Sequence, residues 1–235
     1  MLQLEIWRGG ATGGFRTYRI PLREAQTVLD AVTEVQRTQD ATLAYRFSCR
    51  VGMCGSCAMM VNDRPRWTCR TRVAAVAPRG RLRLGPLRHL PVVKDLVVDM
   101  APFFAKWQRA HGRFDPGPEP ASEFARVPPG EPERRAADAG IECIGCGICY
   151  AACDVVGWTP DYLGPAALNR AWTLVNDARD RGGTARLDAV AQSGGCQNCH
   201  SHMACSETCP KGIAPTYAIA GLKRLAMRAA LGMRR

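Results

Sequence analysis

The sequence lacks the features of a membrane-spanning or secreted protein. No apolar run approaches the roughly 18 residues that a membrane helix requires, and the most apolar stretch, residues 91–104, is interrupted by Lys94, Asp95 and Asp99. Residues 1–7 alternate in hydrophobicity like a strand and contain no apolar region typical of a signal peptide. We therefore expect a soluble or peripheral protein in a reducing compartment, where disulfides are rare.

Acidic residues are scarce relative to basic ones. The chain has 21 Asp and Glu against 32 Lys and Arg, which gives a net charge of +11 at pH 7. Residues 210–235 contain six Lys and Arg and no acid. No helix-turn-helix, zinc-finger or aromatic RNA-binding signature accompanies this charge, so we expect no nucleic-acid partner. An anionic membrane face, an acidic partner subunit and a solvated basic tail all remain compatible with it.

Loop-closing cysteine spacings are also missing, although 12 of the 235 residues are cysteine. The cysteines stand in tight groups, unlike those of a small disulfide scaffold. Because thiolates are metal ligands, the grouping favours metal binding.

The first hundred residues show a strand–strand–helix pattern. Residues 2–7 and 15–21 alternate like strands on either side of a glycine-rich turn, and residues 81–84 predict a closing strand. Thr27 and Asp30 form a capping-box signature at the start of a predicted helix over residues 27–38. This order is typical of a β-grasp fold, although periodicity alone does not identify that fold.

The first cysteine group follows that helix and consists of Cys49, Cys54, Cys57 and Cys69. The first three are separated by four and two residues, and the fourth lies twelve positions further on. This is the plant-type spacing of a 2Fe-2S cluster. Gly52 and Gly55 permit left-handed backbone and leave N–H groups free to bond sulfur. A zinc site is the alternative, but the four-residue gap does not match the cysteine pairs that zinc normally uses.

A proline-rich stretch separates this region from a helical one. Six prolines fall within residues 116–132, which predicts a linker and a domain boundary. Residues 95–109 before it predict a short helix. Beyond it, helical spacing of apolar residues and helix-start signals predict helices over residues 165–179, 184–192 and 215–228.

Two further cysteine runs lie in the helical region. The first run is Cys143, Cys146, Cys149 and Cys153, and the second is Cys199, Cys205 and Cys209, with His202 where a fourth cysteine would stand. These are bacterial ferredoxin spacings, in which the last cysteine of one run ligates the cluster of the other. The crossing predicts a 4Fe-4S cluster on Cys143, Cys146, Cys149 and Cys209. It also predicts a 3Fe-4S cluster on the three remaining thiolates, Cys153, Cys199 and Cys205.

Two residues near the last run complicate this assignment. Imidazole also ligates iron, so His202 is an alternative fourth ligand that would retain a fourth iron. Cys196 lies three residues before Cys199 and is interpreted as a buried thiol outside the ligand set.

Together, the three sites in this order resemble the iron–sulfur subunit of succinate dehydrogenase and fumarate reductase. The likeness covers nearly the whole chain and includes CRVGMCGSC (49–57), PVVKDLVVDM (91–100), PDYLGPA (160–166) and CPKG (209–212). It implies an α+β fold with a β-grasp 2Fe-2S ferredoxin domain over residues 1–110. A Pro-rich linker over residues 111–135 and an all-α ferredoxin domain over residues 136–235 would follow.

The resemblance also implies the role of the chain. It would be the electron-transfer subunit of a membrane-bound succinate:quinone oxidoreductase, respiratory complex II of the tricarboxylic acid cycle, with no substrate chemistry of its own. Its expected partners are a flavoprotein subunit with FAD, membrane-anchor subunits with or without haem b, and a quinone. The expected location is the cytoplasmic face of a bacterial inner membrane.

By the same resemblance, Trp158, His200 and Lys223 match quinone contacts of the family. The sequence departs from the family at Asp154, where most members have proline, and at Gly157, which replaces the first residue of a tryptophan pair. Both departures border the expected quinone pocket.

The direction of electron flow is left open by the sequence. Trp158 and His200 slightly favour succinate oxidation, whereas Gly157 and the YAAC sequence that ends at Cys153 are closer to fumarate reductases. A ferredoxin-type subunit of another flavoprotein oxidoreductase, such as a glycolate or heterodisulfide type, is a second alternative. A basic zinc protein that binds nucleic acid is a third.

Overall fold

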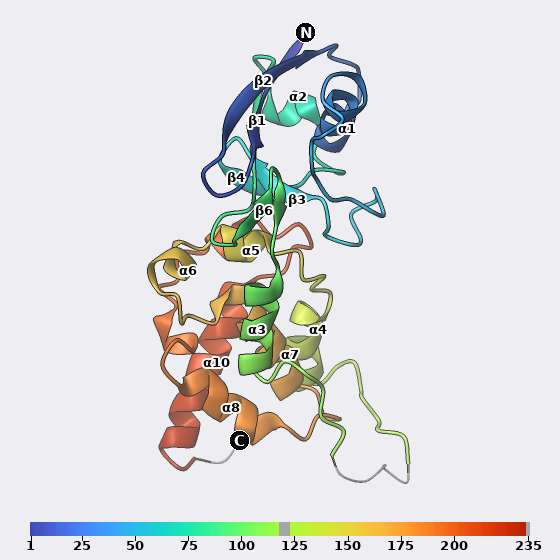
Figure 1. The fold of residues 1–235 in the computed structure, drawn as a ribbon. Helices are drawn as coiled ribbons and strands as arrows, with labels where there is room; N and C mark the ends of the chain where they lie inside the picture. Colours follow the sequence, from blue (N-terminus) through green and yellow to red (C-terminus); the bar gives the residue numbers. More distant parts are fainter. Residues whose placement is uncertain (118–122, 234–235) are drawn as a thin grey trace. The chain divides into compact units, whose positions relative to one another are not determined.

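The computed structural model describes residues 1–117 and 123–233, and the chain forms two compact units (Figure 1). The first unit comprises Met1–Met100 and Ile144–Ala152, and the second comprises Ala101–Cys143 and Cys153–Arg235. The chain therefore changes unit three times. Residues 118–122 of the predicted linker, and Arg234 and Arg235 of the basic segment, lie outside the described residues.

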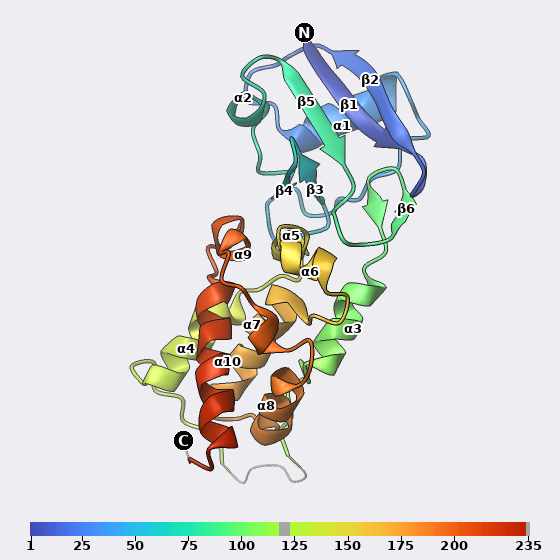
Figure 2. The same cartoon turned by 90° about the vertical axis from the view of Figure 1, so that its left-hand side faces the viewer.

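The first unit is built on a five-stranded sheet of order β2-β1-β5-β3-β4 (Figure 2). Its strands are β1 (Leu2–Arg8), β2 (Gly14–Ile20), β3 (Ala58–Val61), β4 (Arg64–Trp67) and β5 (Arg81–Gly85). β1 and β5 pair in parallel and all other neighbours are antiparallel. The strands predicted over residues 2–7, 15–21 and 81–84 are confirmed to within one residue.

Helix α1 (Val28–Thr38) supplies much of the core of this unit. Leu2, Leu4 and Ile6 of β1 alternate with exposed or partly buried neighbours, and they share one buried cluster with apolar residues of α1. The predicted capping box is present, because Thr27 Oγ1 accepts from Asp30 N at 3.1 Å and Asp30 Oδ2 accepts from Thr27 N at 3.0 Å.

The helix predicted over residues 95–109 is wrong in its first half. Asp95 has a left-handed φ of +52°, and β7 (Val97–Val98) pairs with β6 (Val92–Lys94) in a small separate sheet. Helix α3 (Ala101–Arg109) begins only in the second unit, with Pro102 in its first turn, where a missing N–H costs nothing. Two short helices, α2 (Val73–Val76) and α5 (Ile148–Ala151), complete the first unit.

Helix α7 (Gly164–Val175) is the central element of the second unit and is buried along most of its length. It packs against four other helices: α3, α4 (Pro132–Ile141), α8 (Gly183–Ala191) and α10 (Pro215–Ala230). At the α10 contact the two helices approach closely, because a Cβ atom on Gly221 would lie 2.3 Å from the Trp172 ring. Glycine therefore fixes how near these helices come.

The helices predicted from residues 184 and 215 are confirmed to within two residues, but α7 ends four residues earlier than predicted. The side chain of Asp177 accepts hydrogen bonds from the backbone N–H of Arg179 and from its guanidinium, which makes a turn there. The unit also contains α6 (Asp154–Trp158), the 3₁₀ segment Cys196–Asn198 and α9 (Ala204–Glu207).

A buried ion pair holds the segment that follows α3 to the rest of the second unit. Arg186 is 1% exposed and pairs with Asp180 at 2.6 Å, and its other N–H groups donate to the carbonyls of His111 and Arg113. A buried guanidinium with this many partners fixes the backbone around it.

In the described part of the chain, no helix combines the length and the hydropathy that crossing a membrane requires.

Candidate metal centres

The first cysteine group is assembled by the hairpin of β3 and β4. Cys57 directly precedes β3 and Cys69 lies two residues after β4, and Thr68 donates to the Cys57 carbonyl through both its backbone N–H (3.3 Å) and its hydroxyl (2.9 Å). Both thiols are buried, whereas Cys49 is partly buried and Cys54 is exposed. The hairpin therefore brings the last two cysteines of the group together.

The loop that precedes the hairpin wraps its amides around a sulfur atom. Cys49 Sγ accepts from the backbone N–H groups of Val51, Met53 and Cys54 at 3.2–3.4 Å. The curvature depends on left-handed backbone at Gly52 (φ +76°) and Gly55 (φ +73°), as the sequence predicted. Amide donors of this kind stabilise a thiolate or a cluster sulfur.

The pKa values of two thiols in this group are shifted in opposite directions. Hydrogen bonds from the Cys49 backbone and the Ser56 hydroxyl lower the pKa of Cys54 to about 6. Burial raises the pKa of Cys69 to about 11, and the neighbouring thiols of Cys57 and Cys49 add to that effect. The loop therefore favours the thiolate at its exposed end and the neutral thiol at its buried end, where a bound metal would have to displace the proton.

The cysteines predicted to bind the 4Fe-4S cluster are divided between the two units. Cys146 and Cys149 belong to the first unit, and Cys143 and Cys209 belong to the second. Within the first unit, Cys146 lies directly against the first loop, since a Cβ on Gly55 would be 2.6 Å from Cys146 Cβ. Gly147 (φ +77°) then caps α5.

The third group lies wholly in the second unit. Cys153 precedes α6, Cys199 follows the 3₁₀ segment, and Cys205 lies in α9. All three line one small cavity, together with Tyr162, Pro165, Thr216, Ile219 and residues 200–204. Burial is the largest cause that raises the pKa of the Cys153 and Cys205 thiols, and the neighbouring Cys199 raises both further.

Two residues of this cavity were not singled out from the sequence. Tyr162 is 1% exposed, and burial, the three thiols and a hydrogen bond to Cys199 raise the pKa of its phenol, which stays neutral. The Thr216 hydroxyl lies 3.4 Å from Cys205 Sγ and 2.9 Å from Ser206 Oγ. The only sequence signal for either residue was the PDYLGPA motif around Tyr162.

The backbone next to this cavity is strained. Ser201 (φ +57°) and Met203 (φ +63°) both adopt left-handed conformations, which non-glycine residues seldom do. The resulting bend stacks the rings of His200 and His202 with centroids 6.0 Å apart, and the Trp158 ring meets His202 edge-on at 6.0 Å. Trp158 is 67% exposed. Backbone strain of this kind is concentrated at functional sites.

Of the three predicted quinone contacts, Trp158 and His200 therefore each contact the His202 ring. Lys223 has a different environment, because its Nζ donates to the Cys199 carbonyl at 2.8 Å and ties α10 to the loop. Cys196 is fully buried, as expected from the sequence. Among the residues described, no three or more His, Cys, Asp or Glu side chains lie close enough together to bind a single metal ion.

The fold and the cysteine groups define an iron–sulfur protein of two ferredoxin-type regions. Residues 3–105 match the family model of a 2Fe-2S iron–sulfur cluster binding domain, and residues 140–213 match that of a 4Fe-4S dicluster domain. The α+β fold class is thereby confirmed.

Relatives narrow the class to one family. A fumarate reductase iron–sulfur subunit of Mycobacterium tuberculosis is 38% identical over 92% of this chain and 87% of its own length. A succinate dehydrogenase iron–sulfur subunit of Paracoccus denitrificans is 37% identical over 84% of this chain and 75% of its own. A chain of the Mycobacterium smegmatis Sdh1 complex superimposes with a TM-score of 0.88 at 27% identity and covers 97% of this chain and 96% of that one. The chain belongs to the iron–sulfur subunits of succinate dehydrogenase and fumarate reductase.

Proposed function

We propose that this subunit relays electrons between a flavoprotein that interconverts succinate and fumarate and a membrane quinone, through 2Fe-2S, 4Fe-4S and 3Fe-4S clusters. The observation that carries the proposal is the cavity that Cys153, Cys199 and Cys205 line together. Three thiolates around one space suit a cluster with three ligands. The clusters would supply one-electron centres, and the protein would set their potentials through hydrogen bonds and burial.

The proposed ligand sets are those that the spacing predicts. Cys49, Cys54, Cys57 and Cys69 would hold the 2Fe-2S cluster, and Cys143, Cys146, Cys149 and Cys209 the 4Fe-4S cluster. Cys153, Cys199 and Cys205 would hold the 3Fe-4S cluster. We retain with them the division into domains at residues 1–110 and 136–235, joined by a linker over residues 111–135.

The quinone end of the subunit is proposed at the exposed rings beside the third cysteine group. Trp158 and His200 would contact the quinone, and the contact of each with the His202 ring supports placing them in one site. Lys223 would act mainly through the Cys199 carbonyl that it holds. This end would meet the membrane-anchor subunits on the cytoplasmic face of a bacterial inner membrane.

The flavoprotein is proposed to dock on the loop of the first cysteine group. Phe47, Val51 and Met53 beside these cysteines are exposed although they are apolar. Residues 41–93 contain ten arginines and a single acid, Asp63. Within residues 1–117 and 123–233, the only ion pair that these arginines make is Arg83–Asp63 at 3.7 Å. An acidic, partly apolar surface on the partner would match this face.

We propose succinate oxidation as the physiological direction, with FAD on the flavoprotein, and quinol:fumarate reduction as the alternative. The relatives carry both names, and the one at 38% identity is a fumarate reductase subunit. Succinate–quinone and quinol–fumarate rates of the purified native complex distinguish the two directions.

Electron paramagnetic resonance (EPR) of that complex tests the clusters. We expect one signal in the oxidised state from the 3Fe-4S cluster and additional signals on reduction from the other two. A colourless, zinc-loaded preparation would exclude electron transfer. A second four-iron signal in place of the 3Fe-4S signal would instead favour His202 as a ligand.

A further inference from the structure

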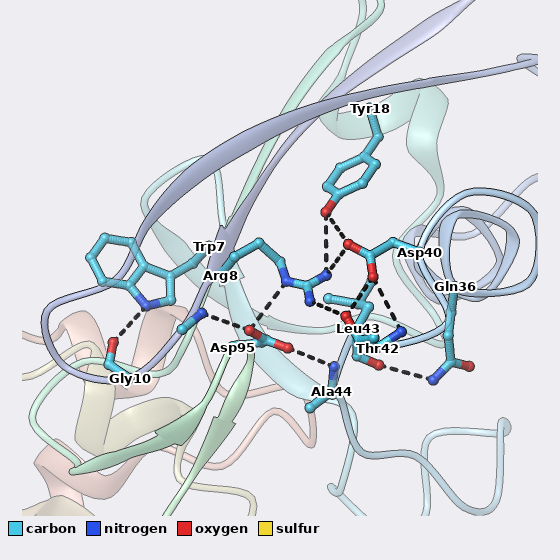
Figure 3. Close-up of polar contacts among 11 residues, drawn as sticks. Trp7, Arg8, Gly10, Tyr18, Gln36, Asp40, Thr42, Leu43, Ala44 and Asp95 are labelled. Atoms are coloured by element: carbon cyan, nitrogen blue, oxygen red, sulfur yellow. Dashed lines mark hydrogen bonds and ion pairs between the residues drawn. The ribbon is translucent and has the colours of Figure 1, made fainter.

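Asp95 lies at the centre of a polar cluster in the first unit (Figure 3). Its side chain is 1% exposed, so its charge requires partners in the protein. Oδ1 accepts from Arg8 Nε at 3.2 Å and from Gly9 N at 2.7 Å, and Oδ2 accepts from Ala44 N at 2.8 Å. The carboxylate thus joins the end of β1 to a segment far from it in sequence.

That segment leads into the first cysteine group. Residues 44–48, here called the loop stem, connect Ala44 to Cys49. The stem is held at two further points by the strip of chain that begins with Asp95. Leu96 N donates to the Ala44 carbonyl at 3.2 Å, and the Arg46 guanidinium donates to the Val98 carbonyl at 3.1 Å.

Arg8 has a second carboxylate partner, Asp40, whose other hydrogen bonds go to different residues from those of Asp95. Asp40 pairs with Arg8 at 2.7 Å and also accepts from the Tyr18 hydroxyl and from both the backbone N–H and the hydroxyl of Thr42. None of these donors belongs to the loop stem. The two carboxylates share one guanidinium, but only Asp95 contacts the stem.

We propose that Asp95 is a positioning residue for the 2Fe-2S site, because its carboxylate holds the loop stem in the conformation in which Cys49 meets the other three cysteines. The inference rests on the proposed ligand set at Cys49, Cys54, Cys57 and Cys69. It assigns to Asp95 a role in retaining the cluster, in addition to its contribution to the fold.

The chemistry of Asp95→Asn makes the role testable. Three N–H donors face the two oxygens of Asp95, and two of them share Oδ1. An asparagine would keep its single oxygen beside Arg8 and Gly9 and turn its NH₂ toward the Ala44 N–H, where two donors repel. The substitution therefore releases the stem, whereas Asp40→Asn removes the same charge from the same arginine without touching it.

The experiment measures cluster loss in the complete complex with its partner subunits. We follow the 2Fe-2S EPR signal during incubation with an iron chelator, with the other two clusters as internal references. Asp95→Asn is expected to lose the 2Fe-2S signal about tenfold faster than the wild type, the factor for one lost hydrogen bond at the upper end of its range. Asp40→Asn is expected to stay within about twofold, and the other clusters should be unaffected in both variants.

Equal acceleration in both variants would overturn the inference, because the carboxylates would then only stabilise the sheet. An unchanged rate in Asp95→Asn would overturn it as well. A wild-type complex without any 2Fe-2S signal would instead reject the ligand set on which the inference rests. If Asp95→Asn does not assemble, Arg46→Met removes the third attachment of the stem, the bond to Val98, at an exposed site. A faster loss of the signal supports the inference, and an unchanged rate overturns it.

Discussion

The first and third cysteine groups, one in each unit, differ in what surrounds their sulfur atoms. Around Cys49 and Cys54, backbone N–H groups and a hydroxyl donate to sulfur in a partly open loop. Around Cys153 and Cys205 the surroundings are closed, and burial is the main influence on the thiols. Directed donors therefore act at the Cys49 and Cys54 end of the first site, whereas burial dominates at its Cys69 end and around the third group.

The two parts of the chain also differ in net charge. Residues 1–100 contain sixteen Lys and Arg against eight Asp and Glu, while residues 101–235 contain sixteen against thirteen. Most of the net charge of +11 therefore belongs to the first unit, near the open loop. This charge would favour the acidic partner surface that we propose for the first unit.

The largest expected effect comes from mutations that remove a proposed ligand from one of the two sites at a time. Cys57→Ala should abolish the 2Fe-2S EPR signal and leave the 3Fe-4S signal, whereas Cys205→Ala should do the reverse, since each removes a proposed ligand of one site only. Cys196→Ala is the matched control, because this thiol is buried and we propose that it is not a ligand. Loss of either signal in the control would show that the ligand assignment is wrong.

The second largest effect is a loss of stability that is confined to the second unit. Arg186→Met leaves the Asp180 carboxylate buried without its cation and frees the carbonyls of His111 and Arg113. We expect a destabilisation of about 3–5 kcal/mol. Hydrogen exchange of the amides in the second unit would measure it as a lower free energy of opening. The double variant with Asp180→Leu should recover part of it. No recovery would mean that the lost hydrogen bonds matter more than the charge, since Asp180 also accepts from the N–H groups of Asp115 and Gly182.

Two glycines offer a smaller, matched comparison between the units. Gly55 and Gly212 both have left-handed backbone, with φ of +73° and +69°. A Cβ on Gly55 would clash with Cys146, whereas one on Gly212 meets nothing within 4 Å. Gly212→Ala should cost about 1–2 kcal/mol from backbone strain alone, and Gly55→Ala should cost more and disturb the 2Fe-2S spectrum. Equal costs in denaturant unfolding would contradict the close approach at Gly55.

The smallest effect is a pH dependence in the first unit. Hydrogen bonds from Thr42 and Tyr18 and the nearby Arg8 lower the pKa of Asp40 from 3.8 to about 2. The carboxylate thus stabilises the fold fully above about pH 4, and this contribution is lost as the pH falls toward 2. Asp40→Asn should therefore destabilise the chain at pH 6 and approach the wild type near pH 2. A constant difference in unfolding free energy across this range would contradict the lowered pKa.

Local patterns predicted much of this structure from the sequence. The capping box at Thr27, the strand alternation in residues 2–7 and the left-handed glycines of the first loop depend on neighbouring residues, so the sequence shows them directly. Cysteine spacing is local as well. It identified the groups that the structure brings together at the hairpin and around the closed cavity.

What the sequence did not reveal depends on distant partners. The apolar spacing of residues 95–109 suggested one helix, but Asp95 takes a left-handed conformation while bonding to Gly9 and Ala44, which lie far away in the chain. Tyr162 lines the cavity of the third cysteine group together with Pro165 of α7 and Ile219 of α10, which lie far apart in the chain. The burial of Arg186 likewise depends on the loop at His111, which no spacing rule connects to it.

The segment Ile144–Ala152 belongs to the first unit although it is flanked on both sides by the second. Gly147 packs there against Leu87 and Met100, and α5 contacts β4. A chain that ended at residue 110 would therefore lack a piece of its own first unit. The two ferredoxin regions are not interchangeable modules, and recombination between related genes would preserve this architecture only if both regions were exchanged together.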